Sequence, residues 1–301
     1  MSPPAFTDQI LHISCEGQSM LGILSMPQQP EKTAVLVIVG GPQYRVGSHR
    51  QFVQMARHLA SKGFAVLRFD YRGMGDSSGE PRNFESIDAD VGAAVDALLE
   101  QGHGAIDGVV LWGLCDGASA SLMYLHATND PRIKGLFLMN PWVRSAQTLN
   151  ETHVKHYYRQ RLMEAEFWRK LLRGGIRPDA LGDFLRSAGR LLRNRQRAAV
   201  ADVENRTFQA KMLAGWKEFA HPVRLILSGR DLIAQEFKVH TSAKKIWQDL
   251  LTSPNALVTA FPMADHTFSE LAAQTSVSNN SCEWVLKINA DSSNWHKYKG
   301  K

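Results

Sequence analysis

Residues 108–126 read GVVLWGLCDGASASLMYLH. A short apolar run opens this stretch, and a segment rich in small, helix-compatible residues follows Gly-Leu-Cys-Asp-Gly without a gap. This context is typical of a nucleophile elbow, a strained strand-to-helix turn in which glycines stand where any Cβ would clash. The pattern predicts Cys115 as a nucleophile, with Gly113 and Gly117 as the elbow glycines.

The position of Cys115 also predicts how its thiol is activated. A cysteine at a helix N-terminus lies at the positive end of the helix dipole, which favours the thiolate and lowers the thiol pKa. The backbone N–H of Asp116 is expected to donate to the developing oxyanion. The alternative interpretation is a buried structural cysteine. A second match, Gly-Asp-Ser-Ser-Gly at residues 75–79, runs into Glu80-Pro81 instead of a helix, so we interpret it as a turn-rich loop.

Short apolar runs without alternation recur along the chain. Strands that are buried on both faces have this pattern, and such strands belong to parallel sheets. Two helical periods lie between the runs, at residues 52–60 and 87–99, and a glycine ends each of them. The expected strands comprise residues 34–39, 65–69, 108–112, 135–139, 223–227 and 256–261.

The order of these elements predicts the fold class. The first 26 residues alternate loosely around Glu16-Gly17, as an antiparallel hairpin does. The rest predicts one α/β domain with a mostly parallel central sheet and helices on both faces. Residues 143–220 interrupt the strand–helix alternation with a basic helical segment, which we interpret as a lid insertion. The core then comprises residues 1–142 and 221–301.

Residues suited to acid–base chemistry follow the last two expected strands, where Asp231 and His266 lie. In this architecture the order along the chain is nucleophile, acid, base. We therefore expect His266 to deprotonate Cys115 while Asp231 orients the imidazole. The alternative role of Asp231 is that of a turn residue after glycine. Other carboxylates that are alternatives for the acid are Asp107, Asp116 and Asp265.

The second oxyanion donor is expected in the loop after the first buried strand, Gly40-Gly-Pro-Gln-Tyr44. Pro42 has no N–H and cannot serve. Gln43 is the first choice for the backbone donor and Gly41 the second, because the glycines let the main chain approach a substrate. The alternative interpretation is a tight strand exit without a binding role.

Charge is distributed unevenly along the chain. The whole sequence has 35 Lys and Arg against 29 Asp and Glu, but residues 143–220 alone hold 16 basic and 8 acidic residues. This basic lid is interpreted either as a cap with solvated arginines or as a docking face for an anionic partner. Such a partner would be a membrane surface, an acidic polysaccharide or an acidic carrier protein. A local surplus of this kind does not predict a nucleic-acid-binding protein.

Composition excludes several classes of protein. Hydrophobic residues make up 44% of the chain and charged residues 21%, which is typical of a globular protein. No run approaches the roughly 18 to 20 apolar residues of a membrane-spanning helix, and the N-terminus does not resemble a secretory signal. Cys15, Cys115 and Cys282 lie far apart, so we expect neither a disulfide framework nor a metal site. The cytoplasm is the expected compartment, and no cofactor is expected.

These motifs resemble those of the α/β-hydrolase superfamily along nearly the whole chain. Residues 68–79, RFDYRGMGDSSG, resemble the segment after the fourth strand of serine-aminopeptidase-like and dienelactone-hydrolase-like members, where the role is mainly structural. The combination of GGPQYR, GLCDG and ADHTF is similar to a narrower group, the α/β hydrolases encoded beside exosortase and exopolysaccharide genes in Gram-negative bacteria. Dienelactone hydrolases also use cysteine, so the resemblance implies a Cys-His-Asp triad.

The residues and the resemblance together predict a hydrolase that cleaves an ester, thioester or lactone through an acyl-cysteine intermediate. Its substrate would be a small molecule or a carrier-bound acyl group. An acyltransferase that uses the same acyl-enzyme is the alternative among enzymes, because a thioester passes its acyl group readily to an amine or hydroxyl. A non-catalytic binding or assembly protein on the same scaffold is the alternative from another class.

Overall fold

The computed structural model describes residues 5–41, 44–144 and 207–292 of the chain. Contacts divide the chain into two compact units, one of Met1–Val143 with Lys211–Lys301 and one of Arg144–Ala210. Most of the expected basic lid, residues 143–220, lies outside the described residues, so its structure stays a prediction. Among the described residues, the elements that position the candidate site belong to the first unit.

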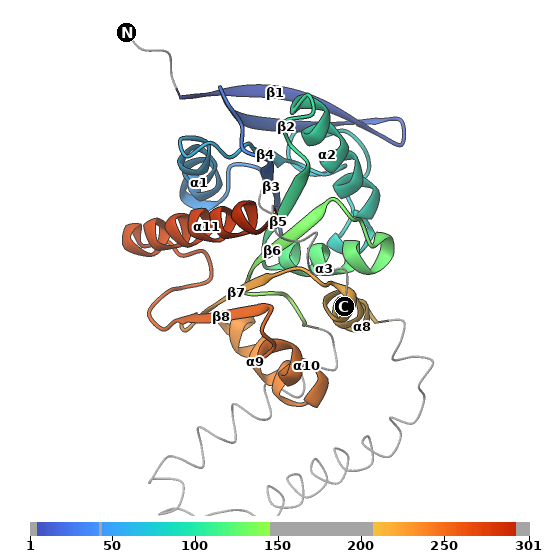
Figure 1. Ribbon diagram of the computed structural model, residues 1–301. Helices are drawn as coiled ribbons and strands as arrows, with labels where there is room; N and C mark the ends of the chain where they lie inside the picture. Colours follow the sequence, from blue (N-terminus) through green and yellow to red (C-terminus); the bar gives the residue numbers. More distant parts are fainter. Residues whose placement is uncertain (1–4, 42–43, 145–206, 293–301) are drawn as a thin grey trace, which may run out of the picture. The chain divides into compact units, whose positions relative to one another are not determined.

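A sheet of eight strands lies at the centre of the described part of the first unit (Figure 1). The strands are β1 Phe6–Cys15, β2 Gln18–Pro27, β3 Thr33–Ile38, β4 Val66–Phe69, β5 Gly108–Leu114, β6 Ile133–Met139, β7 Val223–Ser228 and β8 Ala256–Phe261. Their order across the sheet is β1-β2-β4-β3-β5-β6-β7-β8. The β1–β2 and β2–β4 pairs are antiparallel, and all other neighbours are parallel. The predicted fold class is therefore confirmed, and each of the six apolar runs forms a strand.

Helices cover both faces of the sheet. Those in the described residues are α1 Gln51–Ala60, α2 Asp88–Gln101, α3 Asp116–Thr128, α8 Phe208–Glu218, α9 Leu232–Ser242, α10 Lys245–Leu251 and α11 Leu271–Ser292, with short 3-10 turns η1 Ser48–Arg50 and η2 Phe84–Ser86. Helices α1 and α11 pack together on one face, and α2 and α3 lie on the other (Figure 1). Helix α8 approaches α3 closely, since a Cβ on Gly215 would lie 1.9 Å from the carbonyl oxygen of Leu122.

The core explains why the central strands are apolar without alternation. Successive side chains of a strand point to opposite faces, and both faces of β3, β5 and β7 are covered, so these strands are buried along their whole length. Trp112 of β5 stacks on Phe137 of β6 with ring centroids 5.8 Å apart and meets Phe52 of α1 edge to face at 5.4 Å. Each such pair adds about 0.5–1.5 kcal/mol to the burial of the rings.

Buried charges hold the segment that follows β4. Arg72 donates through Nε to Asp90 Oδ1 at 3.0 Å and through a terminal nitrogen to Asp90 Oδ2 at 2.8 Å. The side chains of this pair are 3% and 0% exposed. Removing one partner would leave a buried charge unpaired, so the pair fixes the start of α2 against this segment.

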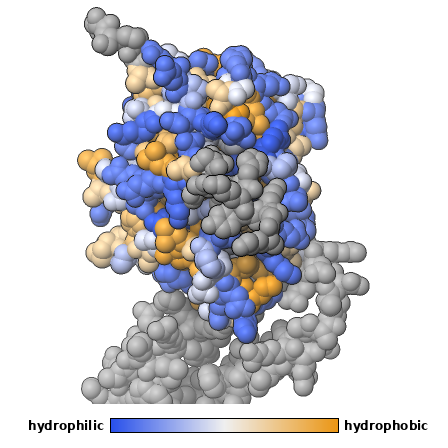
Figure 2. All heavy atoms as spheres, in the orientation of Figure 1, coloured by the Kyte–Doolittle hydropathy of each residue, from blue (hydrophilic) through white to orange (hydrophobic). Residues whose placement is uncertain are grey.

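The surface of the described residues is mixed. Hydrophilic side chains predominate over β1, β2 and α2 in the upper part of the face that Figure 2 shows. The edge strand β8 exposes the apolar side chains of Leu257 and Val258. None of the helices in the described ranges is long and apolar enough to cross a membrane.

Candidate active site

Cys115 lies between the end of β5 and the start of α3. Its φ of 60° and ψ of −122° are unusual for a residue with a side chain. Such a conformation costs on the order of 1–3 kcal/mol and persists only where the surroundings hold it. Here the Cys115 N–H donates to the carbonyl of Met139 at 2.9 Å, and the Cys115 carbonyl accepts from the N–H of Trp142 at 3.3 Å. The strained turn is therefore held by β6 and by the residues that follow it.

Glycines surround this turn because main chains meet there. A Cβ on Gly113 would lie 2.5 Å from the carbonyl oxygen of Gly117, and a Cβ on Gly117 would lie 2.1 Å from that of Ile38 in β3. A Cβ on Gly40, in the loop after β3, would lie 2.5 Å from the carbonyl oxygen of Leu114. The loop that was expected to supply the second oxyanion donor is thus in contact with the turn itself.

Asp231 and His266 meet where β7 and β8 end. His266 Nδ1 lies 2.9 Å from Asp231 Oδ2, and the Asp231 side chain is 5% exposed. The carboxylate also accepts from the N–H groups of Ile233 and Ala234 at 3.1 and 3.2 Å, so it caps the N-terminus of α9. Asp231 is therefore both a capping residue and the partner of the imidazole. This arrangement leaves Nε2 of His266 for proton transfer.

The other carboxylates considered for the acid have different partners. Asp265 accepts from the N–H of Ser269 at 2.9 Å and from its hydroxyl. These hydrogen bonds hold the pKa of Asp265 below its usual value. Asp107 precedes β5 and lies at the opposite end of that strand from Cys115. Asp231 is thus the one of the four whose carboxylate contacts the imidazole.

The side chain of Asp116 lies between the thiol and the loop after β3. The Cys115 thiol donates to Asp116 Oδ1 at 3.0 Å, and the N–H of Gly41 donates to Asp116 Oδ2 at 3.1 Å. Asp116 was expected to act through its backbone N–H or as an alternative acid, and its contact with the thiol was not predicted, although an acidic residue next to the cysteine was a usable signal. The thiol is not hydrogen-bonded to His266 in the described part of the chain. Gln43, the first choice for the backbone donor, lies outside the described residues.

The neighbourhood of Cys115 favours the neutral thiol. Burial raises the pKa of the thiol, and the charge of Asp116 and its hydrogen bond raise it further. A hydrogen bond from the backbone of Asp116 lowers the pKa of the thiol, but by less than the other effects raise it. The prediction of a lowered pKa is therefore wrong for this arrangement. A helix N-terminus carries the equivalent of about half an elementary charge, and the full charge of a contacting carboxylate outweighs it.

Arg45 anchors the far end of the loop after β3. Its N–H donates to Asp70 Oδ1 at 2.7 Å, and its guanidinium pairs with both Asp70 and Asp76. Asp70 is fully buried, and both acids belong to the segment RFDYRGMGDSSG. The two carboxylates therefore hold the loop in place, which is a structural role.

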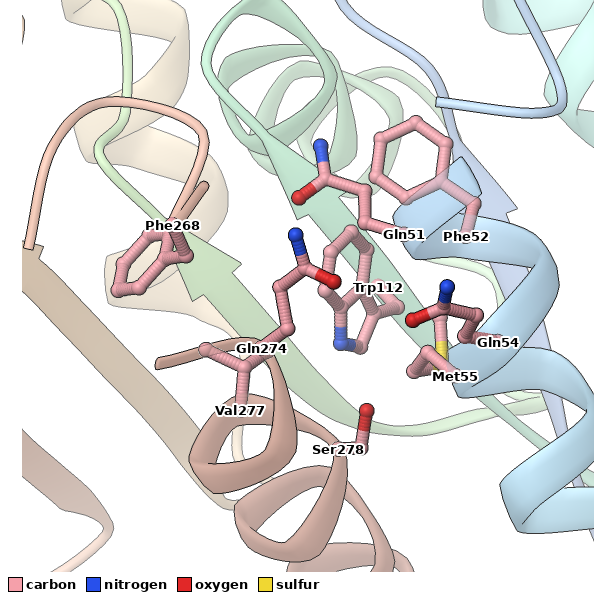
Figure 3. A pocket seen from close by; sticks show the side chains of 9 residues that line it. All are labelled: Gln51, Phe52, Gln54, Met55, Trp112, Phe268, Gln274, Val277 and Ser278. Carbon is pink, nitrogen blue, oxygen red and sulfur yellow. The ribbon is translucent and has the colours of Figure 1, made fainter. Parts of the chain in front are cut away.

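A small pocket lies beside the loop that carries His266 (Figure 3). Gln51 and Phe52 of α1, Trp112 of β5, Phe268 and Gln274 are among the residues that line it. It has room for about one water molecule, so it does not accommodate an acyl chain. The described residues contain no group of three His, Cys, Asp or Glu that could hold a metal ion.

Comparison with known proteins places this site in a family. The chain matches the Alpha/beta hydrolase family over residues 35–275. Human Protein ABHD12B is 32% identical over 83 residues, and the match covers 26% of this chain and only 20% of that protein. The esterase Pf2001 from Pyrococcus furiosus has a TM-score of 0.62 at 15% identity, with 94% of this chain and 91% of that one covered. The dienelactone hydrolase from Anabaena variabilis has a TM-score of 0.59 at 15% identity, with 94% and 99% covered.

The two solved structures share the fold with this chain. Because their sequence identity to it is low, the likeness shows the fold alone. The family match carries more weight, because it extends from β3 to the start of α11. It therefore spans the strained turn at Cys115 and the loops that hold Asp231 and His266. This protein belongs to the Alpha/beta hydrolase family.

Proposed function

We propose that this protein hydrolyses a carboxylic ester, thioester or lactone, with Cys115 as nucleophile, His266 as base and Asp231 as the residue that orients it. The observation that carries the proposal is the hydrogen bond of 2.9 Å between Asp231 and His266. An imidazole held by a buried carboxylate has a defined tautomer and a free Nε2. Family membership and the fold shared with an esterase and a dienelactone hydrolase agree with this assignment.

The reaction would proceed in two steps through a thioester. Nε2 of His266 takes the thiol proton as Sγ of Cys115 bonds to the carbonyl carbon, and the C=O electron pair moves to the oxygen. Collapse of this intermediate breaks the bond to the leaving group, which receives the proton from His266. A water molecule that His266 deprotonates then attacks the thioester, and the acid and the free thiol are released.

The oxyanion would be stabilised by the backbone N–H of Asp116 and by an N–H of the loop after β3, from Gln43 or Gly41. The carboxylate of Asp116 contacts the N–H of Gly41 at 3.1 Å, so a substrate oxygen would have to displace it from there. Displacement would also take away a charge that raises the pKa of the thiol. Substrate binding would therefore favour formation of the thiolate.

Hydrolysis of p-nitrophenyl acetate tests the assignment. We expect wild type to turn over, Cys115→Ala to lose nearly all of the rate, and Asp231→Asn to lose about 10²- to 10⁴-fold in kcat. Circular dichroism and thermal unfolding check that each variant folds. Equal activity of wild type and Cys115→Ala would reject Cys115 as the nucleophile. A wild type inactive toward ester, thioester and lactone probes alike would favour the non-catalytic binding protein.

Acyl transfer is the second candidate, because the intermediate would be a thioester at Cys115. Adding an alcohol acceptor to the assay and analysing the products distinguishes an acyltransferase, which forms the new ester, from a hydrolase, which forms the acid. The link to exosortase and exopolysaccharide systems rests on the motifs GGPQYR, GLCDG and ADHTF and stays a prediction.

The basic lid is proposed to bind an anionic partner, on the sequence of residues 143–220 alone. Binding to anionic vesicles, acidic polysaccharide or acidic carrier protein should weaken as salt rises, because salt screens exposed charges. Binding that does not respond to salt for any of the three would count against this role.

A further inference from the structure

Asn140, the first residue after β6, is buried and contacts the loops after β7 and β8. It is 0% exposed and has a φ of 45°, a left-handed conformation that asparagine adopts more readily than most residues. Its Oδ1 accepts from the N–H of Ser228 at 2.8 Å, and its Nδ2 donates to Ser228 Oγ at 2.9 Å and to the carbonyl of His266 at 3.2 Å. An N–H needs an acceptor and a carbonyl needs a donor, so these partners fix the orientation of the amide.

Ser228, the last residue of β7, completes the contact. Its hydroxyl accepts from Asn140 and donates to the carbonyl of Asp265 at 2.8 Å, and the residue is 0% exposed. Asn140 and Ser228 together hold the carbonyls of two consecutive residues, Asp265 and His266. We call Asn140 and Ser228 the loop clamp. A buried polar network whose members all have partners is rigid, so the clamp restrains the backbone from which the His266 imidazole extends.

The loop clamp lies at the point where the acid and the base come together. Ser228 precedes Asp231 by three residues, and the hydrogen bond of 2.9 Å between Asp231 and His266 joins the two loops that the clamp connects. Two backbone hydrogen bonds also join these loops, from Gly229 to Phe261 at 2.8 Å and from Arg230 to Ala264 at 3.0 Å. Both of these bonds hold residues of the second loop that precede His266. The loop clamp holds the backbone carbonyl of His266 itself.

We propose that the loop clamp positions His266 for proton transfer in the reaction proposed above, on which this inference rests. Neither Asn140 nor Ser228 bonds to an atom of Cys115 or to the imidazole in the described residues, so both act through the backbone. A misplacement of about 1 Å in a catalytic group can cost on the order of 10²-fold in rate. Loss of the clamp is therefore expected to lower kcat and to leave KM within about twofold.

Two serines provide a matched pair of variants. The hydroxyl of Ser281 in α11 accepts from Trp112 Nε1 at 3.0 Å and donates to the carbonyl of Val277 at 2.8 Å, and Ser281 is also 0% exposed. Ser228→Ala and Ser281→Ala therefore each remove one accepted and one donated hydrogen bond from a fully buried site. We expect similar falls in melting temperature for the two variants. Only Ser228→Ala should lose kcat, by tenfold or more.

Asn140→Asp tests the other half of the clamp. Aspartate has the same shape and also adopts the left-handed conformation, but an ionised carboxylate cannot donate to Ser228 or to the carbonyl of His266. The expected result is a loss of kcat comparable to that of Ser228→Ala. Unchanged kcat in both Ser228→Ala and Asn140→Asp would overturn the proposal. An equal loss of kcat in Ser281→Ala would overturn it as well, because any buried hydroxyl would then have the same effect.

Proton NMR of the His266 ring provides a measurement that needs no turnover. The Nδ1 proton shared with Asp231 should give a far-downfield resonance in wild type and in Ser281→Ala, and that resonance should be lost in Ser228→Ala. A resonance that persists in Ser228→Ala would overturn the loop clamp whatever the activity. In one combination of results, wild type hydrolyses no ester while the resonance is present in wild type and Ser281→Ala and absent in Ser228→Ala. That combination would reject the proposed reaction and support the positioning of His266 by the loop clamp.

Discussion

Replacing Asp116 with asparagine should make the thiol of Cys115 more reactive. The Asp116 carboxylate accepts the thiol hydrogen bond at 3.0 Å and places negative charge beside a sulfur that must itself become negative. Burial raises the pKa of this thiol, and the charge of Asp116 adds to the effect. Asparagine keeps the size of the side chain and an oxygen for the N–H of Gly41, but it removes the charge.

The size of the effect follows from that contact. A hydrogen bond to a charged group contributes about 1.5–3 kcal/mol, and one pKa unit corresponds to about 1.4 kcal/mol. Losing the interaction should lower the pKa of the Cys115 thiol by about 1 to 2 pH units, which raises the thiolate fraction about 10- to 100-fold. Nucleophilicity falls with the pKa, with a Brønsted coefficient of about 0.4–0.5. The alkylation rate at a pH below the pKa should therefore rise about 3- to 15-fold.

Alkylation by iodoacetamide, followed by mass spectrometry of the peptide that contains Cys115, measures this rate. The rate profile of Asp116→Asn should lie at lower pH than that of wild type, because the thiolate forms earlier. Asp107→Asn is the matched control, since it removes the same charge from an exposed position at the other end of β5. The reasoning is refuted if Asp116→Asn reacts like wild type at every pH, or if Asp107→Asn is accelerated equally.

Three further predictions concern stability, measured by urea unfolding. Gly117→Ala should lower the free energy of unfolding by more than about 3 kcal/mol, because its Cβ would lie 2.1 Å from a carbonyl oxygen of β3. An unchanged unfolding midpoint would contradict this. Arg72→Ala leaves Asp90 buried without its partner and should lower the free energy of unfolding by about 3–5 kcal/mol. Arg57→Ala breaks an exposed pair and should lower it by less than about 1 kcal/mol, so equal losses in the two variants would contradict the reasoning. Burial lowers the pKa of His240 to about 4, so the unfolded chain takes up this proton first and stability is lost as the pH falls from about 6.5 to about 4. His240→Gln should flatten that fall by about 1–3 kcal/mol, and an unchanged pH slope would count against it.

Features with a local cause could be predicted from the sequence. The turn at Cys115 needs glycine on both sides because main chains meet there, and that need is visible in five consecutive residues. The apolar runs predicted the central strands because burial on both faces leaves no room for alternation. The proximity of Asp231 and His266 could also be expected, since the carboxyl ends of neighbouring parallel strands lie at the same edge of the sheet.

Features that depend on how loops approach one another could not be predicted in the same way. The position of Cys115 at a helix N-terminus predicted a lowered thiol pKa, but burial and the side chain of Asp116, which contacts the sulfur, raise that pKa instead. Asn140 follows an apolar strand and carries no motif in the sequence. Its contact with His266 joins residues 126 positions apart, and it depends on the sheet order in which β7 lies beside β6 and β8 lies beside β7.

The glycine contacts around the turn do not depend on which side chain stands at position 115. The atoms that would clash with a Cβ at Gly40, Gly113 or Gly117 all belong to the main chain, so every residue type at position 115 meets the same turn. A single base change can exchange cysteine for serine there, whereas no side chain fits at the glycines. In the reaction proposed above, such an exchange would change the covalent intermediate from a thioester to an ester and would leave the glycines of the turn as they are.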